Sequence, residues 1–327
     1  MLSRIVNSTT FRIVAIIAGF TIFAYATSVN KITDFVIFCI YVMGFDLLYG
    51  RMGRISFGHM LYLGSGAYGA ALCAKYLVPD PFLAILMGIA FGAAVGVILG
   101  PIVVKTKGAA FALINVAFNQ LGYFIVLVAA ARFTGGEDGM SLQFNSYGFV
   151  NFANVHFLFS FCLGCLVLVY YLTQRLSRSA FGAMLTGIKE NEIRVRFLGY
   201  NTSLYKWIAF VLSTSISALA GALFTINYGY ANPSFIDPAR NVEVIFAALI
   251  GGPGTELGPV VGGTAYMVIS NYLAKYITRW ELFLGAALLI IAFRFRKGLV
   301  GYLQELITNR TRSRAQRLER AGGKEDA

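Results

Sequence analysis

The chain has 327 residues, of which 57% are hydrophobic and only 13% are charged, and its mean hydropathy is +0.69. This composition excludes an ordinary soluble enzyme and places the chain among membrane proteins. Lys and Arg outnumber Asp and Glu by 27 to 15, but the basic residues stand between apolar segments and at the C-terminal end. They therefore predict orientation in a membrane and do not predict nucleic-acid binding.

Apolar segments of the length that a bilayer requires recur along the whole chain. A hydrocarbon core of about 30 Å needs about 20 apolar residues in a helix. The predicted segments are 11–29, 32–50, 60–78, 82–104, 108–131, 157–174, 207–229, 242–252, 259–277 and 281–295. We therefore predict an all-α, polytopic membrane protein with about ten transmembrane helices, some of them broken or re-entrant at glycines. This transmembrane domain covers residues 1–308, and a basic tail follows at 309–327.

The charges that flank these segments alternate between two sides, as the positive-inside rule requires. One side holds Arg4, Arg12, Arg51, Arg54, Lys105, Lys107, the loop 174–206 and the residues from Arg294 onward. The other side holds Lys31, Asp34, Asp80, Glu137, Asp138, Asp237, Arg240, Lys275 and Arg279. This alternation predicts that both termini are cytoplasmic, with the tail either solvated or in contact with anionic lipid.

The segment 50–69, GRMGRISFGHMLYLGSGAYG, interrupts the helical pattern with glycines. Irregular backbone at membrane depth lines a cavity or is buried in protein, so Ser56 and His59 are candidates for a substrate pathway. A buried structural histidine is the alternative for His59. Asn115 and Asn119, inside an apolar segment, are assigned to the same pathway.

Asp46 is an isolated charge near the end of an apolar segment. An unpaired charge inside a span costs roughly 2.5 to 3.5 kcal/mol on insertion scales. We therefore expect an ion pair with Arg51 or Arg54 in preference to a proton relay.

The loop 174–206 is the longest polar stretch between two apolar segments. Its apolar side chains recur at helical spacing, which predicts one helix over most of 180–198 with a shared apolar face. That face is formed by Phe181, Leu185, Ile188, Val195 and Leu198. The predicted N-cap is Ser177 or Ser179, and Gly199 with Asn201 predicts the stop. Pairs at i,i+4 are expected for Glu190–Arg194 and Glu192–Arg196. A plain basic loop is the alternative interpretation.

Two further loops are rich in glycine: TGGEDGM at 134–140 and ALIGGPGTELGPVVGG at 248–263. In the second, Gly251, Gly252 and Gly254 prevent a continuous helix, so freed backbone groups are predicted to face the substrate pathway. A tight re-entrant turn without a ligand role is the alternative.

The sequence contains no pattern typical of an enzyme active site. The four cysteines fall in apolar stretches, and we predict that they pack as small hydrophobes without a disulfide framework or a metal site. No GxxxxGK[ST] occurs, so a P-loop for ATP is not expected, and neither is any other cofactor.

The order of residues in and after the 174–206 loop resembles the cytoplasmic coupling segment of LivM-type permeases of branched-chain amino acid ABC importers. The matching positions are Ser179, Phe181, Gly182, Ile188, Glu190, Asn191, Glu192, Ile193, Leu198, Gly199, Tyr205, Lys206, Ala209, Phe210, Ser213, Ala220, Gly221 and Ala222. The 50–68 run is similar to the same family at Gly50, Gly53, Ser56, Gly58, His59, Gly64, Gly66, Ala67 and Tyr68. The two glycine-rich loops also resemble it. Arg194, Arg196 and Asp46 depart from the family pattern.

The resemblance implies an inner-membrane permease that forms half of a pathway for branched-chain or other small apolar amino acids. Its implied partners are a second homologous permease, two ATPase subunits that use ATP, and a periplasmic substrate-binding protein. The 174–206 loop is then the ATPase docking surface, with Ile188 and Val195 as anchors and Glu190 as the residue that sets register. The coupling residues assigned on this basis are Phe181, Leu185, Ile188, Lys189, Glu190, Glu192, Arg194, Val195 and Gly199.

Three other functions stay open at this point. Related systems carry urea, short amides or aromatic acids. An ion-coupled secondary transporter would need ionisable residues inside its spans, and the chain offers little beyond Asp46, Glu243 and His59. A channel is the weakest of these alternatives.

Overall fold

A computed structural model describes residues 9–145, 151–277, 282, 285–286 and 298–302. Within these residues the protein is all-α apart from one two-stranded ladder, as predicted. The helices are α2 (Thr9–Ala26), α3 (Val29–Asp46), α4 (Met60–Leu72), α5 (Pro81–Val103), α6 (Ala109–Phe124), α7 (Ala131–Thr134), α8 (Val155–Ser177), α9 (Ala180–Phe197), α10 (Thr202–Tyr228), α11 (Asn241–Gly251) and α12 (Gly258–Tyr276). The strands are β1 (Met140–Ser141) and β2 (Tyr230–Ala231), which pair antiparallel.

Short helical turns, some wide and some tight, extend or connect several of the helices. Wide helical turns continue α3, α4 and α6 over Leu47–Arg51, Cys73–Leu77 and Ile125–Ala129, and single 3₁₀ turns occupy Gly136–Asp138, Pro233–Phe235 and Pro238–Arg240. The predicted segment 281–295 lies mostly, and the tail 309–327 wholly, outside the described residues.

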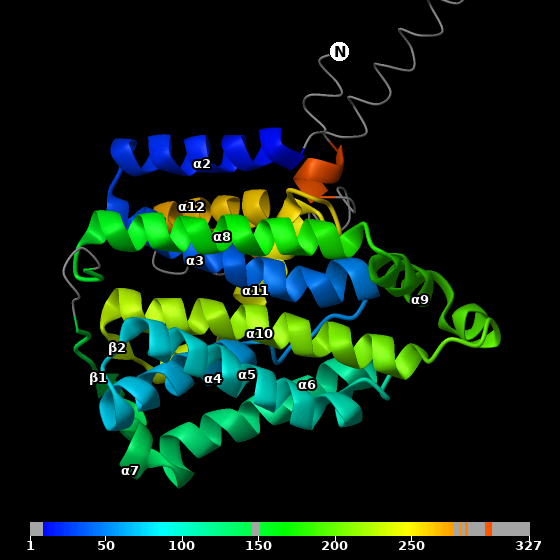
Figure 1. The fold of residues 1–327 in the computed structure, drawn as a ribbon, viewed down its shortest axis with the longest axis horizontal. Helices are drawn as coiled ribbons and strands as arrows, with labels where there is room; N and C mark the ends of the chain where they lie inside the picture. Colours follow the sequence, from blue (N-terminus) through cyan, green and yellow to red (C-terminus); the bar gives the residue numbers. More distant parts are fainter. Residues whose placement is uncertain (1–8, 146–150, 278–281, 283–284, 287–297, 303–327) are drawn as a thin grey trace, which may run out of the picture.

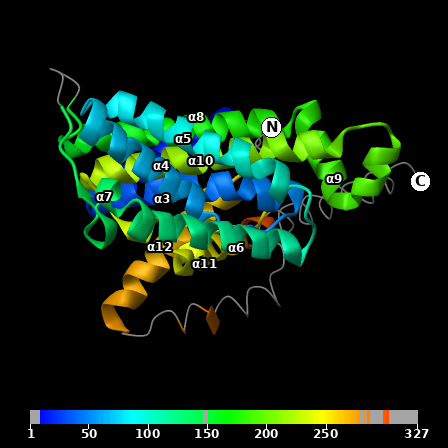
Figure 2. The ribbon, with the colours of Figure 1, turned by 90° about the horizontal axis from the view of Figure 1, so that it is seen from below.

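The long helices lie side by side along the long axis of the molecule (Figure 1). At one end α9 projects past its neighbours, and Figure 2 shows it reaching beyond the end of α6. At the opposite end lie β1, β2 and α7 (Figure 1). We call these the α9 end and the β-ladder end.

The core is built around α3 and α10. α10 packs on α3, α4 and α5, and α3 also packs on α8 and α12. In the most apolar window of α3, 89% of residues are buried, against 17% for α2. The helices α2, α5 and α6 are mostly exposed in this chain, and their exposed faces are apolar. These faces are therefore suited to contact with lipid or with another membrane subunit.

Six helices in the described part of the chain are long and apolar enough to cross a membrane: α2, the extended α3, α5, the extended α6, α8 and α10. The predicted count of about ten is therefore not confirmed. The segment 242–252 is the clearest difference, because α11 has 11 residues and a length of about 16 Å, half of a hydrocarbon core of about 30 Å. The segment 60–78 likewise contains only the 13 residues of α4 and one wide turn.

Two segments without α-helix lead into these short helices from opposite ends of the bundle and meet near its middle. Residues 52–59 run from the α9 end to α4, and residues 230–240 run from the β-ladder end to α11. The backbone N–H of Met60 donates to Asn241 Oδ1 (2.8 Å), and Asn241 Nδ2 donates to Asn119 Oδ1 (2.5 Å). A buried asparagine side chain thus supplies a hydrogen bond to backbone at the start of α4 that water cannot reach.

Candidate functional site

Helix α9 begins and ends close to the predicted residues. Ser179 is the N-cap, and its Oγ accepts from the Gly182 N–H (3.4 Å). Gly199 has a φ of +87°, a conformation that glycine adopts without strain, so it stops the helix as expected.

The predicted single helix is broken at Asn191. Asn191 has an extended backbone (φ −157°, ψ 92°), and its Oδ1 accepts from the backbone N–H of Arg194 (3.0 Å). It therefore acts as an N-cap for a second, short helical stretch. This break also explains why the expected Glu190–Arg194 pair does not form in the described residues, whereas Glu192–Arg196 does (3.3 Å).

The apolar face of α9 packs on the chain itself. Leu185, Ile188 and Val195 are buried. The Phe181 ring contacts that of Tyr205 in a tilted arrangement, with the ring centroids 5.7 Å apart. The prediction that Leu198 shares this face is wrong: it is 70% exposed and lies just past Phe197, the last residue of the helix.

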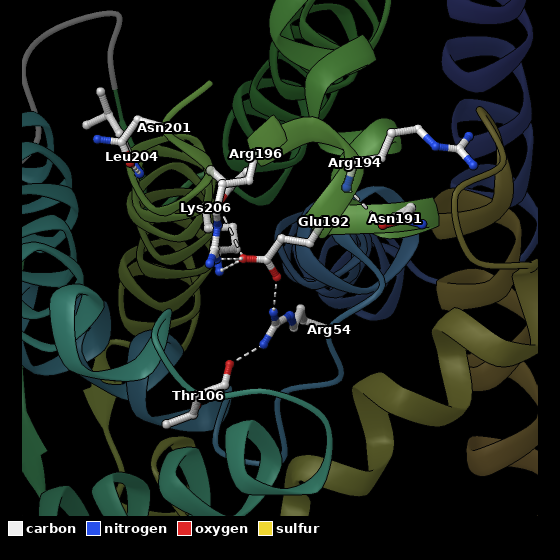
Figure 3. A network of polar contacts seen from close by, with 10 residues as sticks. Arg54, Thr106, Asn191, Glu192, Arg194, Arg196, Asn201, Leu204 and Lys206 are labelled. Carbon is white, nitrogen blue, oxygen red and sulfur yellow. Dashed lines mark hydrogen bonds and ion pairs between the residues drawn. The ribbon is translucent and has the colours of Figure 1, made fainter. Parts of the chain in front are cut away.

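The acidic residue that interrupts the apolar stripe, Glu192, lies at the centre of a charge cluster (Figure 3). Glu192 Oε2 pairs with Arg54 Nη2 (3.2 Å), and Oε1 accepts from Lys206 Nζ (2.7 Å), Arg196 Nη2 (3.3 Å) and Thr202 Oγ1 (3.3 Å). Arg54 in turn donates to the Thr106 carbonyl and lies over the Phe111 ring. The cluster joins α9 to the start of α10, to the 52–59 segment and to the loop before α6.

The cluster is largely shielded from solvent. The side chains of Lys206, Arg54 and Glu192 are 3%, 11% and 12% exposed, so each charge depends on its partners. Burial opposes ionisation of Glu192, but the hydrogen bond from Lys206 and the charges of Lys206 and Arg54 outweigh it, and the pKa of the Glu192 carboxyl lies below its ordinary value. Glu192 is thus held as an anion between two buried cations.

A second contact joins the first half of α9 to the end of α3. Lys189 Nζ donates to the Gly50 carbonyl (2.8 Å), although the sequence assigns Lys189 to an outward docking surface. Together with Glu192–Arg54 it holds the 50–54 segment from both sides of the Asn191 break. These two contacts connect α9 directly to the backbone that leads to Ser56 and His59.

Asp46 does not form the expected ion pair with Arg51 or Arg54 in the described residues. Its Oδ1 accepts from the backbone N–H of Gly254 instead (2.9 Å), and Arg54 is taken by Glu192. Gly254 has a φ of +77°, and a Cβ there would lie 2.7 Å from the Gly50 carbonyl oxygen. The unwound backbone of the 251–254 loop thus contacts the 46–50 segment.

Two other predicted pathway residues in this loop have structural contacts. Gly251 packs against Gly258, and the Gly252 N–H donates to the Ala248 carbonyl at the end of α11. Whether Gly251, Gly252 and Gly254 also face solute stays a prediction.

His59 is fully buried among three aromatic rings, those of Tyr41, Phe45 and Tyr62. Its Nε2 is 2.8 Å from the Ser217 hydroxyl on α10. This position links the 52–59 segment to the central helix, and it leaves a direct role for His59 in the pathway as a prediction.

The other predicted pathway residues are buried as well. Ser56 has no exposed surface and no hydrogen-bond partner for its hydroxyl in the described residues. Asn115 accepts from the Tyr62 hydroxyl (3.1 Å), and Asn119 Nδ2 donates to the Ile236 carbonyl (2.8 Å). Asn115 and Asn119 thus contact the helix and the segment that meet near the middle of the bundle, which gives both a structural role. Their role in the substrate pathway stays a prediction.

Sequence reasoning found one partner of Glu192, Arg196, but it did not find the two buried cations Arg54 and Lys206. It considered Arg54 only for Asp46, and Lys206 only as a matching position. A signal was present, since Lys206 is a cation at the start of an apolar helix and Glu192 is an anion on an apolar face, and each needs a partner.

Comparison with known proteins places the chain in a family. Residues 27–293 match the family described as branched-chain amino acid transport system / permease component. The chain belongs to this family. Together with the apolar helices above, this membership makes the chain a multi-pass membrane protein.

Individual relatives are distant but cover most of the chain. The high-affinity branched-chain amino acid transport system permease protein LivM of Salmonella typhimurium is 25% identical over 293 residues, which is 82% of this chain and 68% of the relative. BraD of Pseudomonas aeruginosa, a permease protein of the same kind of system, is 25% identical over 84% of this chain and 94% of its own length. The ribose import permease protein RbsC of Haemophilus influenzae is 27% identical over 76% and 74%. No solved structure matches the chain.

Proposed function

We propose that the chain is a permease subunit of an ATP-binding-cassette importer in the bacterial inner membrane. It contributes part of the translocation pathway for branched-chain or other small apolar amino acids. The relatives named for branched-chain amino acid transport support this substrate class, and those named for ribose and autoinducer 2 make sugar-like solutes the second candidate. Urea, short amides and aromatic acids remain further alternatives.

The energy for import comes from outside the chain in this proposal. Two separate ATPase subunits hydrolyse ATP, a second homologous permease completes the pathway, and a periplasmic binding protein delivers substrate. The charge alternation of the sequence predicts that α9 and both termini are cytoplasmic.

The observation that carries the proposal is the position of α9. It projects from one end of the bundle (Figure 1) and is tied to residues 50–54 by two contacts. Glu192 pairs with Arg54 (Figure 3), and Lys189 donates to the Gly50 carbonyl. A solvated surface helix would not need two buried cations, Arg54 and Lys206, around the carboxylate of Glu192. An ATPase that moves α9 would move residues 50–54 with it.

The docking surface is proposed on the side chains that α9 leaves exposed. The predicted anchors Ile188 and Val195 are buried in this chain, whereas Ile193, Phe197 and Leu198 are 60%, 87% and 70% exposed. Exposed apolar groups of this size on a projecting helix are typical of a partner surface. They lie beside exposed Arg194 and Arg196, which would set register with an acidic partner surface.

The test is copurification of the ATPase with the permease. A buried hot-spot truncation costs about 2 kcal/mol or more, which is roughly a thirtyfold weaker complex. Phe197→Ser should therefore lose the ATPase, while Phe133→Ser, which alters a 58% exposed aromatic at the β-ladder end, should keep it. Equal retention by both variants would refute docking at α9.

A further inference from the structure

A cavity of about 410 Å³ lies near the β-ladder end of the bundle, where α3, α4, α10 and α12 surround it. It is separate from the Glu192 cluster, and it includes Met60, the first residue of α4, where the two broken segments meet. Its charged lining residues are Asp34, Arg240 and Glu243.

Two of these charges neutralise each other. Arg240 holds Glu243 in a bidentate pair, Nε on Oε1 (2.8 Å) and Nη2 on Oε2 (3.2 Å). Arg240 Nη1 makes only one longer contact, to the Ser234 carbonyl (3.4 Å), so this nitrogen retains an N–H for another acceptor.

Asp34 has no such cation. Its Oδ1 accepts from Asn227 Nδ2 (2.7 Å), with the Tyr228 hydroxyl as a second neutral donor. In the described part of the chain no Lys, Arg or His lies within ion-pair distance of it. The cavity therefore carries one uncompensated carboxylate, which favours a cationic group.

A second group in the cavity lacks a partner. The Tyr41 side chain is 1% exposed, and its hydroxyl makes no hydrogen bond to the described residues. Its ring is fixed beside those of Phe38 and His59. A buried hydroxyl without a partner costs about 1 to 3 kcal/mol, so an acceptor that reached this one from the cavity would gain a hydrogen bond.

The remaining wall is mainly apolar. It is formed largely by Phe38, Met60, Leu63, Phe224, Phe235 and Met267. A ligand that fits must combine a cationic end, an acceptor end and a small apolar body.

We propose that this cavity is a binding site for an α-amino acid with an apolar side chain. Asp34 accepts from the ammonium group, Tyr41 and the Arg240 Nη1 group donate to the carboxylate, and the apolar wall contacts the side chain. The inference rests on the proposed import function, locates a site for its first substrate class and disfavours the sugar-like second candidate, because an uncharged sugar would gain little from an unpaired carboxylate.

The test measures binding of tritiated leucine to the full chain in lipid nanodiscs. Asp34→Asn keeps an acceptor for Asn227 but removes the charge, and it should weaken binding of leucine and of leucine methyl ester about tenfold or more. Tyr41→Phe keeps the ring and should weaken leucine several-fold but weaken the methyl ester less, because the neutral ester carbonyl is a weaker acceptor than a carboxylate. Glu137→Gln removes an exposed carboxylate at the same end and should bind both ligands like the unaltered chain.

Several outcomes would overturn the site. Unchanged leucine binding by Asp34→Asn, or an equal loss in Glu137→Gln, shows that the Asp34 charge does not select the ligand. Competition by ribose, or by 4-methylpentanoate, which lacks the ammonium group, contradicts the substrate class. In vesicles containing the partner subunits, ATP-dependent ribose uptake without leucine binding overturns this inference and leaves the importer function standing. Solute uptake that needs no ATP overturns the importer function itself.

Discussion

The Glu192 carboxylate and the Arg54 guanidinium lie 3.2 Å apart, although 138 residues separate them in the chain. Glu192 belongs to a helix that projects from the bundle, and Arg54 to the non-helical segment that leads into the membrane helices. Because Lys206 at the start of α10 shares the same carboxylate, one side chain connects three parts of the fold. The predictions below follow mainly from this connection.

Removal of the Glu192 charge should destabilise the fold. Glu192→Gln leaves Lys206, whose side chain is 3% exposed, without its counter-charge, and breaking a buried pair costs about 3 kcal/mol or more. Thermal unfolding of the purified chain in detergent measures this loss. Glu190→Gln, which alters an exposed carboxylate on the same helix, should unfold like the unaltered chain. Equal melting temperatures for the two variants would show that the cluster does not stabilise the fold.

The same carboxylate predicts a pH dependence. The pKa of Glu192 lies below its ordinary value of 4.5, so its ionised form contributes stability that is fully present above that pH and is lost as the pH falls through the lower, folded-state pKa. The stability difference between the unaltered chain and Glu192→Gln should therefore shrink on acidification below pH 4.5. Melting curves across this range check it, and a constant difference would contradict the assignment.

The close approach of Gly254 and Gly50 predicts a site that excludes any side chain. Gly254→Ala places a Cβ against the Gly50 carbonyl and in a backbone conformation with φ +77°, which costs a non-glycine residue roughly 1 to 2 kcal/mol before any clash. Gly164→Ala on α8 meets nothing within 4 Å and should be neutral or stabilising. Thermal stability of the two variants in detergent should differ in this direction, and the opposite order would exclude a close contact between the two loops.

The orientation of the bundle predicts where reporters are active. A reporter enzyme that works only outside the cytoplasm should be active when fused after Gly139 and silent when fused after Glu190, because these residues lie near opposite ends of the bundle and the α9 end is basic. A fusion after Lys105 should match the one after Glu190. The reverse pattern would place α9 outside the cell and remove it from contact with a cytoplasmic ATPase.

Sequence reasoning predicts those parts of the fold that local chemistry determines. Ser179 and Gly199 bound α9 because a capping hydroxyl and a residue with positive φ act within one turn. It misses the break at Asn191, since an asparagine within a helical pattern caps a new turn only when neighbouring contacts favour it. Apolar composition also identifies 242–252 as a span, but α11 has only 11 residues between the 230–240 segment and the glycine-rich loop, a limit that hydropathy does not reveal.

The contacts of the candidate site are harder to predict for a different reason. Arg54, Glu192 and Lys206 meet because three separate elements converge, and one sequence contains no direct signal for such a distance. Buried charge nevertheless implies a partner, and that rule applied to Lys206 and Glu192 together would suggest the pair.

The central claim is that α9 transmits the work of ATP hydrolysis through Glu192. The most direct measurement is solute uptake per ATP hydrolysed, in vesicles that contain the permease pair, the ATPases and substrate-loaded binding protein. Glu192→Gln leaves exposed Phe197 in place, so the ATPase should still copurify and hydrolyse ATP while uptake per ATP falls about tenfold or more, the equivalent of about 1.4 kcal/mol of lost coupling. Glu137→Gln, which alters an exposed carboxylate at the β-ladder end, should keep the unaltered ratio. An unaltered ratio in Glu192→Gln, with the ATPase bound, would contradict the account.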